Sequence, residues 1–168
     1  MSVFAFLFQD WEKNRGNTKG RIAALAFRGA NACKKYKYLK IFFFLHALWY
    51  KFFFEWIIGM EIPKEVTIGK GLKIYHLQAI VINKNVRIGT DCQLRHSTTI
   101  GNKGTGGKCP VIGNNVNIGA HVCIIGDIVI GDNVNIGAGS VVVKDVPSNC
   151  TVVGNPAKII TQIKQCYE

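Results

Sequence analysis

An aliphatic residue at every sixth position is the feature that most restricts how this chain can fold. The longest run in phase has six members, from Ile112 to Val142, and glycine directly follows four of them. An α-helix repeats every 3.6 residues and an ordinary strand every two, so neither produces this pattern. A hexapeptide repeat predicts a parallel β-helix. The positions in the pattern are Ile68, Ile74, Ile80, Ile82, Ile88, Leu94, Ile100, Ile112, Ile118, Ile124, Ile130, Ile136 and Val142.

Each hexapeptide supplies one short strand and one turn, and three of them close a triangular coil of about 18 residues. The aliphatic side chain points into this prism and stacks on its equivalent about 4.8 Å away. Glycine and asparagine relieve backbone strain at the corners, as in 113–115 and 131–133. We therefore expect a mainly β protein with an N-terminal helical segment over 1–60, a β-helix over 61–155 and a C-terminal tail over 156–168.

Two breaks in the repeat predict local departures from the prism. Ile74 and Ile82 are eight residues apart, which predicts a widened corner. Ile100 and Ile112 are twelve apart with no aliphatic residue midway, so 102–111 should leave the prism as a loop. The loop contains Gly106 followed by glycine rather than lysine, so it does not match a nucleotide-binding phosphate loop. We expect a flap whose lysines, Lys103 and Lys108, face an anionic ligand.

Two histidines should be neighbours at the widened corner. His76 follows Ile74 by two residues, and His96 follows Leu94 by two residues, one coil later. The coil spacing places their rings about 5 Å apart. Histidine is suited to general-base catalysis near neutral pH, so the pair indicates a catalytic corner; a polar stack without a chemical role is the alternative.

The other two histidines receive different interpretations. His121 lies three residues after Ile118, so we expect it to be solvated or to face another subunit. We expect Asn114 and Asp132, rather than His121, to continue the histidine corner in the next coils. His46 falls within the helical segment and is interpreted as structural.

The first 60 residues are basic and apolar, with ten Lys or Arg against three Asp or Glu. The composition predicts a helix over 21–40, preceded by a short helix that ends before 16–18. Residues 41–60 are long enough to span a membrane, but Lys51 lies at the centre and can pair with Glu55. Packing on the protein, contact with a membrane surface and a true span all remain open.

The net charge of +11 is compatible with an anionic partner, such as a membrane surface, an acidic substrate or a nucleic acid, or simply with solubility. The sequence contains no nucleic-acid recognition module, so we expect no nucleic acid. The six cysteines form no C-x-x-C pair and no zinc-finger spacing. We therefore expect no metal and a cytoplasmic protein, with the inner face of the plasma membrane as the alternative place of work.

Four stretches within roughly 55–160 resemble the hexapeptide-repeat acyltransferases, and among them the serine acetyltransferase-like branch. These stretches are Ile74–His76, Thr99–Asn102 with the glycine-rich loop, Ile136–Pro147 and Val153–Ala157. The resemblance implies a left-handed β-helix, a homotrimer and acetyl-CoA bound in a groove between subunits.

The same resemblance implies roles for individual residues. His76 would be the general base, oriented by Glu61 where serine acetyltransferases have Asp, and His96 would bind the acceptor or the oxyanion. The coenzyme contacts would map to Gly101, Asn102, Ala120, Gly137, Ala138 and Lys144, with Lys103, Lys144 and Lys158 as candidates for its phosphates.

The chain departs from serine acetyltransferases at the residues that grip serine. Tyr75 replaces the Asp before the catalytic His, and Lys108 and Cys109 replace an Arg-His pair, so these three are candidates for binding another substrate. The stretches 81–86, 95–102 and 108–110 are similar to the acetyltransferases of colanic-acid and capsule biosynthesis. We expect acetyl transfer from acetyl-CoA to a sugar hydroxyl of an exopolysaccharide; a serine acetyltransferase and a non-enzymatic hexapeptide scaffold are the alternatives.

Overall fold

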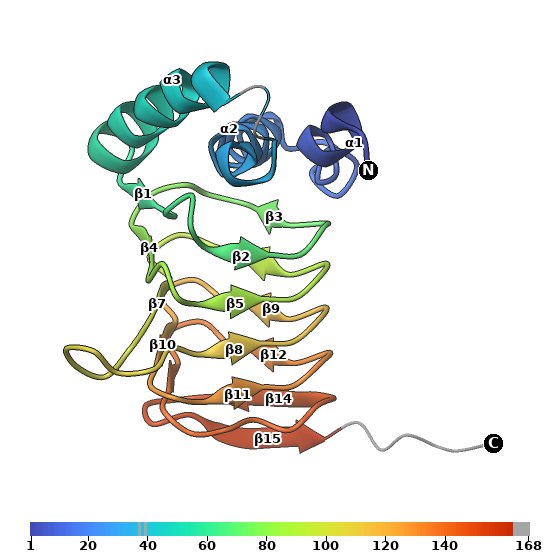
Figure 1. Cartoon of the computed structure of the whole chain (residues 1–168). Coiled ribbons are helices and arrows are strands. Elements are labelled where there is room, and N and C mark those ends of the chain that lie inside the picture. The colour runs from blue at the N-terminus through green and yellow to red at the C-terminus, as the bar shows by residue number, and fades with distance from the viewer. Residues whose placement is uncertain (37, 39, 163–168) are drawn as a thin grey trace.

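The computed structural model describes residues 1–36, 38 and 40–162 (Figure 1). It is mainly β and forms a parallel β-helix of about five turns with a short N-terminal helical segment. The fold class predicted from the six-residue period is therefore confirmed.

Three sheets form the faces of the prism, and from β1 to β13 successive strands of the chain belong to successive sheets. Sheet A contains β1 (Met60–Glu61), β4 (Ile80–Ile82), β7 (Thr99–Gly101), β10 (Cys123–Ile125) and β13 (Val141–Val142). Sheet B contains β2 (Thr67–Ile68), β5 (Arg87–Ile88), β8 (Val111–Ile112) and β11 (Val129–Ile130). Sheet C contains β3 (Lys73–Ile74), β6 (Gln93–Leu94), β9 (Asn117–Ile118), β12 (Asn135–Ile136), β14 (Cys150–Val153) and β15 (Lys158–Gln162).

The aliphatic positions form the core of the prism. Ile74 pairs in register with Leu94, and Ile82 pairs with Ile100 one coil later. The aliphatic repeat positions from Ile68 to Val142 are all buried. Asparagines stabilise the turns between sheets B and C, where Asn115 adopts a positive φ of 53° and its side-chain amide donates to Asn133 at 3.0 Å.

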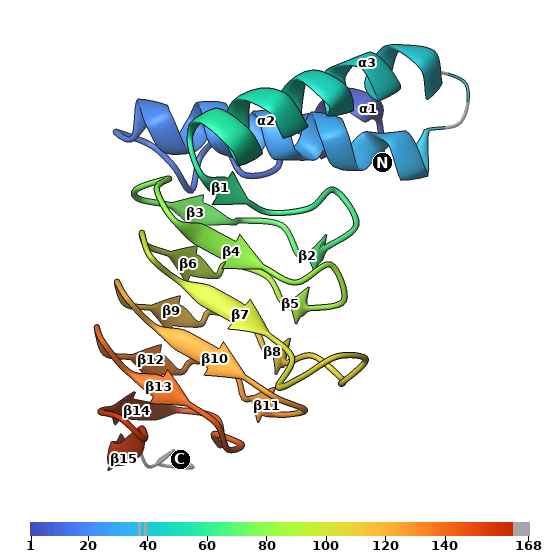
Figure 2. The ribbon, with the colours of Figure 1, turned by 90° about the vertical axis from the view of Figure 1, so that its left-hand side faces the viewer.

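The helical elements of the described residues lie across the first coil (Figures 1 and 2): they include α1 (Val3–Leu7), α2 (Thr18–Lys35), α3 (Lys40–Tyr50) and the π-helix η2 (Lys51–Ile57). The predicted boundaries of 21 and 40 are therefore wrong for α2. Its start is fixed by Asn17, whose side chain accepts a hydrogen bond from the N–H of Gly20. It ends early because the chain reverses direction so that α3 packs along α2.

A buried ion pair joins the helical segment to the first coil. The carboxylate of Asp10 accepts hydrogen bonds from Arg28, with Nε 2.7 Å from Oδ2. Arg28 also donates to the carbonyls of Ile68 and Gly69, at 2.8 and 2.6 Å. Asp10 accepts the N–H of Gly71 at 2.8 Å. These groups satisfy the backbone polar atoms that the first coil cannot pair with a preceding one.

Asparagine side chains extend this edge capping. Asn14 donates to the carbonyl of Leu72 at 2.8 Å, and Asn17 donates to the carbonyl of Ile74 at 2.7 Å. At the opposite end of the solenoid, β15 pairs antiparallel with β14, which ends the parallel stack.

The face that α3 and η2 turn away from α2 is exposed among the residues that the structure describes. Phe43, Ala47, Tyr50 and Phe54 are buried. The exposed residues include ten large apolar side chains: Ile41, Phe42, Phe44, Leu45, Leu48, Trp49, Phe52, Phe53, Trp56 and Ile57. Among the described residues, no helix is both long and apolar enough to span a bilayer. In the structure, residues 41–60 are divided among α3, η2 and the start of β1.

The Lys51–Glu55 pair expected from α-helical spacing is not formed as an ion pair in the part of the chain that the structure describes. These residues lie in η2, whose i→i+5 hydrogen bonds change the α-helical relation between positions four apart. Burial raises the pKa of Glu55, and the nearby positive charge of Lys51 offsets part of that shift.

Candidate active site

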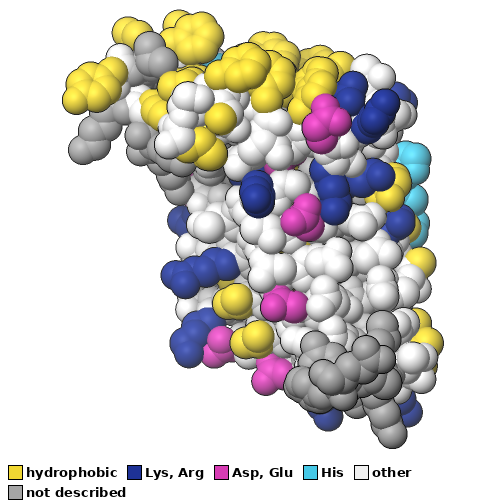
Figure 3. Space-filling model, turned by 90° about the vertical axis from the view of Figure 1, so that its right-hand side faces the viewer, with side chains coloured by type: hydrophobic (Ala, Val, Ile, Leu, Met, Phe, Trp, Pro, Cys, Tyr) yellow, Lys and Arg dark blue, Asp and Glu magenta, His cyan; other side chains and the backbone are white. Residues whose placement is uncertain are grey.

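Three histidines form a column along the turns that lead from sheet C to sheet A, here called the histidine corner. The ring centroids of His76 and His96 lie 5.4 Å apart, which confirms the adjacency that the repeat predicts. The rings of His96 and His121 lie 5.0 Å apart, and both contacts are edge-to-face. Histidine side chains lie one above another along one edge of the molecule in Figure 3.

His121 is exposed, as the sequence predicts for a solvated residue, but its place in this column was not expected. The backbone N–H of His121 donates to the carbonyl of His96. In the parallel register, His121 therefore lies one residue after the position that is equivalent to His96. The backbone of His121 has a positive φ of 58°. Its ring still contacts the ring of His96, although the two residues are one position out of register. Asn114 and Asp132, which we expected at this corner, instead bond to each other at the turns from sheet B to sheet C.

The middle histidine carries an unsatisfied polar atom. Nδ1 of His96 is buried and has no hydrogen-bond partner among the described residues. Buried polar atoms are almost always paired, so an orphan nitrogen here indicates a group poised for a ligand or for a changed ring orientation. His76 and His121, above and below it, are both exposed.

Sheet A has a groove on its outer face, with a volume of about 500 Å³. Glu61 lines this groove together with Gly101 and Asn102. In the described chain, no hydrogen bond or ion pair joins the carboxylate of Glu61 to His76. The orienting role of Glu61 therefore stays a prediction.

The segment between β7 and β8 protrudes from the prism (Figures 1 and 2). Asn102 anchors its base by accepting a hydrogen bond from the amide of Asn83 at 2.9 Å and donating to the carbonyl of Gly104. Lys103 is exposed, and Lys108 is 3.0 Å from Asp127 in an exposed ion pair. Such a pair contributes little stability, and the role of Lys108 toward an anionic ligand stays a prediction.

Cys109 returns the loop to the core. Its side chain is buried in the main hydrophobic cluster, and that burial raises the pKa of the thiol. A neutral thiol is a poor nucleophile, which argues against covalent catalysis by Cys109.

Tyr75 lies beside the histidine corner on the outer face of sheet C. Lys73 and Arg95 each approach its ring, at 4.6 Å from the centroid, and its hydroxyl donates to Gln93 at 3.1 Å. The ring is therefore held by its own strand neighbours, and its substrate-binding role stays a prediction.

The remaining predicted coenzyme contacts fall in two places. Ala120, Gly137 and Ala138 occupy the histidine corner in the lower coils, where the N–H of Gly139 donates to the carbonyl of Ala120. Lys144 and Lys158 line a separate groove of about 260 Å³ near the C-terminal strand.

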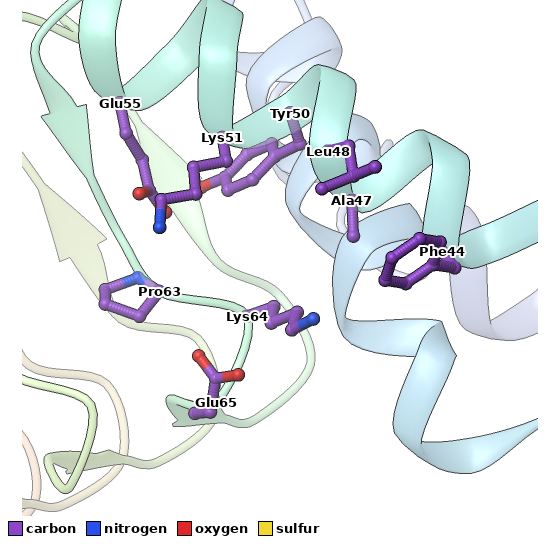
Figure 4. Close-up of a pocket in the computed structure, with 9 residues that line it drawn as sticks. All are labelled: Phe44, Ala47, Leu48, Tyr50, Lys51, Glu55, Pro63, Lys64 and Glu65. Atoms are coloured by element: carbon purple, nitrogen blue, oxygen red, sulfur yellow. The ribbon is translucent and has the colours of Figure 1, made fainter.

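A further pocket of about 390 Å³ lies under α3 (Figure 4). Leu48, Lys51 and Glu55 line it from the helix, and Pro63 and Glu65 line it from the segment after β1. Pro63 and Glu65 also line the groove of sheet A, so the two hollows adjoin.

The histidines and the residues at the base of the loop therefore stand at opposite ends of the strands of sheet A. The histidines precede its strands, whereas Gly101 ends β7 and Asn102 and Lys103 follow it on the opposite side. No group of three or more metal-binding side chains is assembled within the described ranges.

Comparison with known proteins identifies the family. Residues 109–144 match the family model described as bacterial transferase hexapeptide (six repeats). The chain is 40% identical over 161 residues to a protein of Escherichia coli strain K12 provisionally named colanic acid biosynthesis acetyltransferase WcaB, covering 91% of this chain and 98% of that one. The chain belongs to the hexapeptide-repeat acyltransferases. Relatives in this family are named acetyltransferases, and acetyl transfer is the chemistry of this protein.

Serine acetyltransferases are also similar to this hexapeptide-repeat enzyme. It is 37% identical to serine acetyltransferase 1 of Arabidopsis thaliana over 81% of this chain and 45% of that protein. The soybean serine acetyltransferase apoenzyme superposes with a TM-score of 0.79 at 30% identity, over 95% of this chain and 69% of that one. The Brucella abortus enzyme in complex with coenzyme A gives a TM-score of 0.79 at 27% identity, over 96% and 68% of the two chains.

Proposed function

We propose that this acetyltransferase transfers an acetyl group from acetyl-CoA to a hydroxyl of a glycan unit in exopolysaccharide or capsule biosynthesis. The observation that carries the proposal is the exposed histidine column, because a base at an open corner can reach the hydroxyl of a large acceptor. The end-to-end match to a protein named for colanic acid biosynthesis supports the glycan acceptor.

His76 acts as the general base. It takes the proton of the acceptor hydroxyl while the oxygen attacks the thioester carbonyl, giving a tetrahedral oxyanion. Collapse of that intermediate forms the ester and releases the coenzyme A thiolate, which takes the proton from the imidazolium. Glu61 favours the charged imidazole, and His96 donates toward the oxyanion or the acceptor. These reaction steps use only protein side chains, the coenzyme and the acceptor.

Acetyl-CoA lies between neighbouring subunits of a homotrimer. The histidine corner of one protomer and the base of the loop of its neighbour, around Gly101 and Asn102, form the two walls. Two observations support this arrangement: the two sets of residues lie at opposite edges of sheet A, and a related enzyme has been solved with coenzyme A.

An acceptor assay tests the proposal against the second candidate, a serine O-acetyltransferase, which the structural likeness to serine acetyltransferases favours. Release of coenzyme A from acetyl-CoA is measured with L-serine and, separately, with exopolysaccharide repeat-unit oligosaccharides. Transfer to the oligosaccharide, with an acetyl ester located by mass spectrometry, is the expected result. Turnover with L-serine alone would replace the glycan by the amino acid as acceptor.

A further inference from the structure

We propose that the exposed face of α3 and η2 binds the surface of an anionic phospholipid bilayer. This apolar face consists of the ten exposed side chains named above and contains six aromatic rings. Monomeric soluble proteins rarely expose so many contiguous apolar side chains without a partner. Figure 3 shows hydrophobic side chains gathered at the helical end of the molecule, with Lys and Arg side chains beneath them.

The composition of the apolar face fits a bilayer interface. Trp49 and Trp56 are both exposed on it, and tryptophan rings favour the boundary between headgroups and acyl chains. The helix lies across the first coil instead of projecting from it (Figure 2). An element of this kind rests in the interface plane.

Charge selects a membrane over a second copy of the chain. All ten Lys and Arg of the first 60 residues fall within 13–54, and that range contains no Asp or Glu; Arg28 is buried against Asp10 and Lys13 pairs with Asp91, which leaves eight. Each basic residue near an anionic membrane surface strengthens binding to that membrane by about 1 kcal/mol. A symmetric contact between two copies would instead bring this positive segment against itself.

The position of the apolar face leaves the chemistry accessible. The helices cover only the first coil, and the histidine corner runs along the side of the coils below them (Figures 1 and 3). A bilayer on the helical end therefore does not cover the histidines. This binding does not depend on the identity of the acceptor, so it stands or falls separately from the proposed function.

Vesicle flotation tests the proposal with the full chain. The vesicles contain phosphatidylethanolamine with phosphatidylglycerol, and vesicles of phosphatidylcholine alone serve as the neutral comparison. We expect the wild type to float with the anionic vesicles, and the double variant Phe52→Ser/Trp56→Ser to partition at least about tenfold less, because two large apolar groups no longer enter the interface. The ring centroids of Phe52 and Trp56 lie 6.2 Å apart, and both side chains are mostly exposed. Their replacement therefore spares the core.

Val129→Ser is the matched control, because Val129 is 55% exposed on sheet B and Phe52 is 56% exposed. It should float like the wild type. Equal flotation of the double variant and the wild type would overturn the proposal, as would equal wild-type binding to neutral and anionic vesicles. A smaller native mass of the double variant without lipid would also overturn it, because the face would then join protein subunits. Thermal unfolding of each variant establishes that it is folded.

Discussion

His76 is exposed at the upper end of the histidine column, where an acceptor can reach its imidazole. The variant His76→Ala should lower kcat/KM for acetyl transfer by about 10²- to 10⁴-fold, which is the usual contribution of a general base. Thiol titration of the released coenzyme A measures this loss. Gln78→Ala is the control, because Gln78 is exposed at the same corner without an ionisable group. If His76→Ala kept wild-type turnover, the base would have to be sought elsewhere.

Cys109 provides a second prediction at this scale. Because burial raises the pKa of its thiol, the group is neutral at pH 7 and no thiolate is available for attack. Cys109→Ala should therefore keep kcat for acetyl transfer within about threefold of the wild type, with stability lowered modestly by the small cavity. Trapping of an acetylated Cys109 by mass spectrometry would contradict this expectation.

The buried thiol of Cys92 should make the folded protein less stable at alkaline pH. Burial raises the pKa of its thiol to about 11 from the ordinary 9.0, so the folded state resists a deprotonation that the unfolded chain undergoes. The stability that the neutral thiol contributes is complete below pH 9 and is lost as the pH rises toward 11. Urea unfolding across this interval should show a shallower loss for Cys92→Ala than for the wild type. Parallel curves would show that Cys92 does not contribute.

The histidines also show where residue-level prediction from sequence succeeds. His76 and His96 follow their aliphatic residues by the same offset, so the six-residue period suffices to place them together. His121 was missed because its offset is one residue longer. The spacing could have indicated its place. His121 follows His96 by 25 residues, and one coil of about 18 residues plus the six that the loop adds gives nearly the same number.

At the scale of elements, the helical segment functions as the missing neighbour of the first coil. The upper edge of a parallel stack leaves N–H and C=O groups unpaired, and Asp10, Asn14, Asn17 and Arg28 satisfy them with side chains. Sequence could not predict these contacts, because they join residues about 40 to 60 positions apart that no periodic pattern relates. The β-helix itself was predictable, because every coil repeats the same local requirement.

Breaking the Asp10–Arg28 pair should be costly. Arg28→Ala leaves the Asp10 carboxylate buried without its partner, which typically lowers the free energy of unfolding by about 3–5 kcal/mol. Urea denaturation followed by circular dichroism measures the change. Lys13→Ala provides the comparison, because it removes the partly exposed pair with Asp91 at 3.2 Å and should cost less than about 1 kcal/mol. Similar losses in both variants would refute the special role of the buried pair.

At the scale of the whole molecule, a site shared between protomers can be tested by mixing inactive variants. Gly101→Leu should block the groove, since Gly101 lines it and a Cβ there has room, meeting only Asn83, at 3.7 Å. His76→Ala and Gly101→Leu should each be inactive alone. Mixed trimers should regain about one quarter of wild-type activity, because one neighbouring pair in four combines an intact histidine with an intact groove. No recovery after verified subunit exchange would place the whole site within one chain.

The two closed ends of the solenoid determine how long it can be. Stacked parallel strands with bare edges would template the addition of further chains, as in a growing fibre. Here the side chains of the helical segment cap one end, and the reversed strand β15 covers the last parallel strand of sheet C at the other. The middle is thus modular: an extra coil of about 18 residues inserted between β9 and β10 would lengthen the enzyme while leaving both terminators in place.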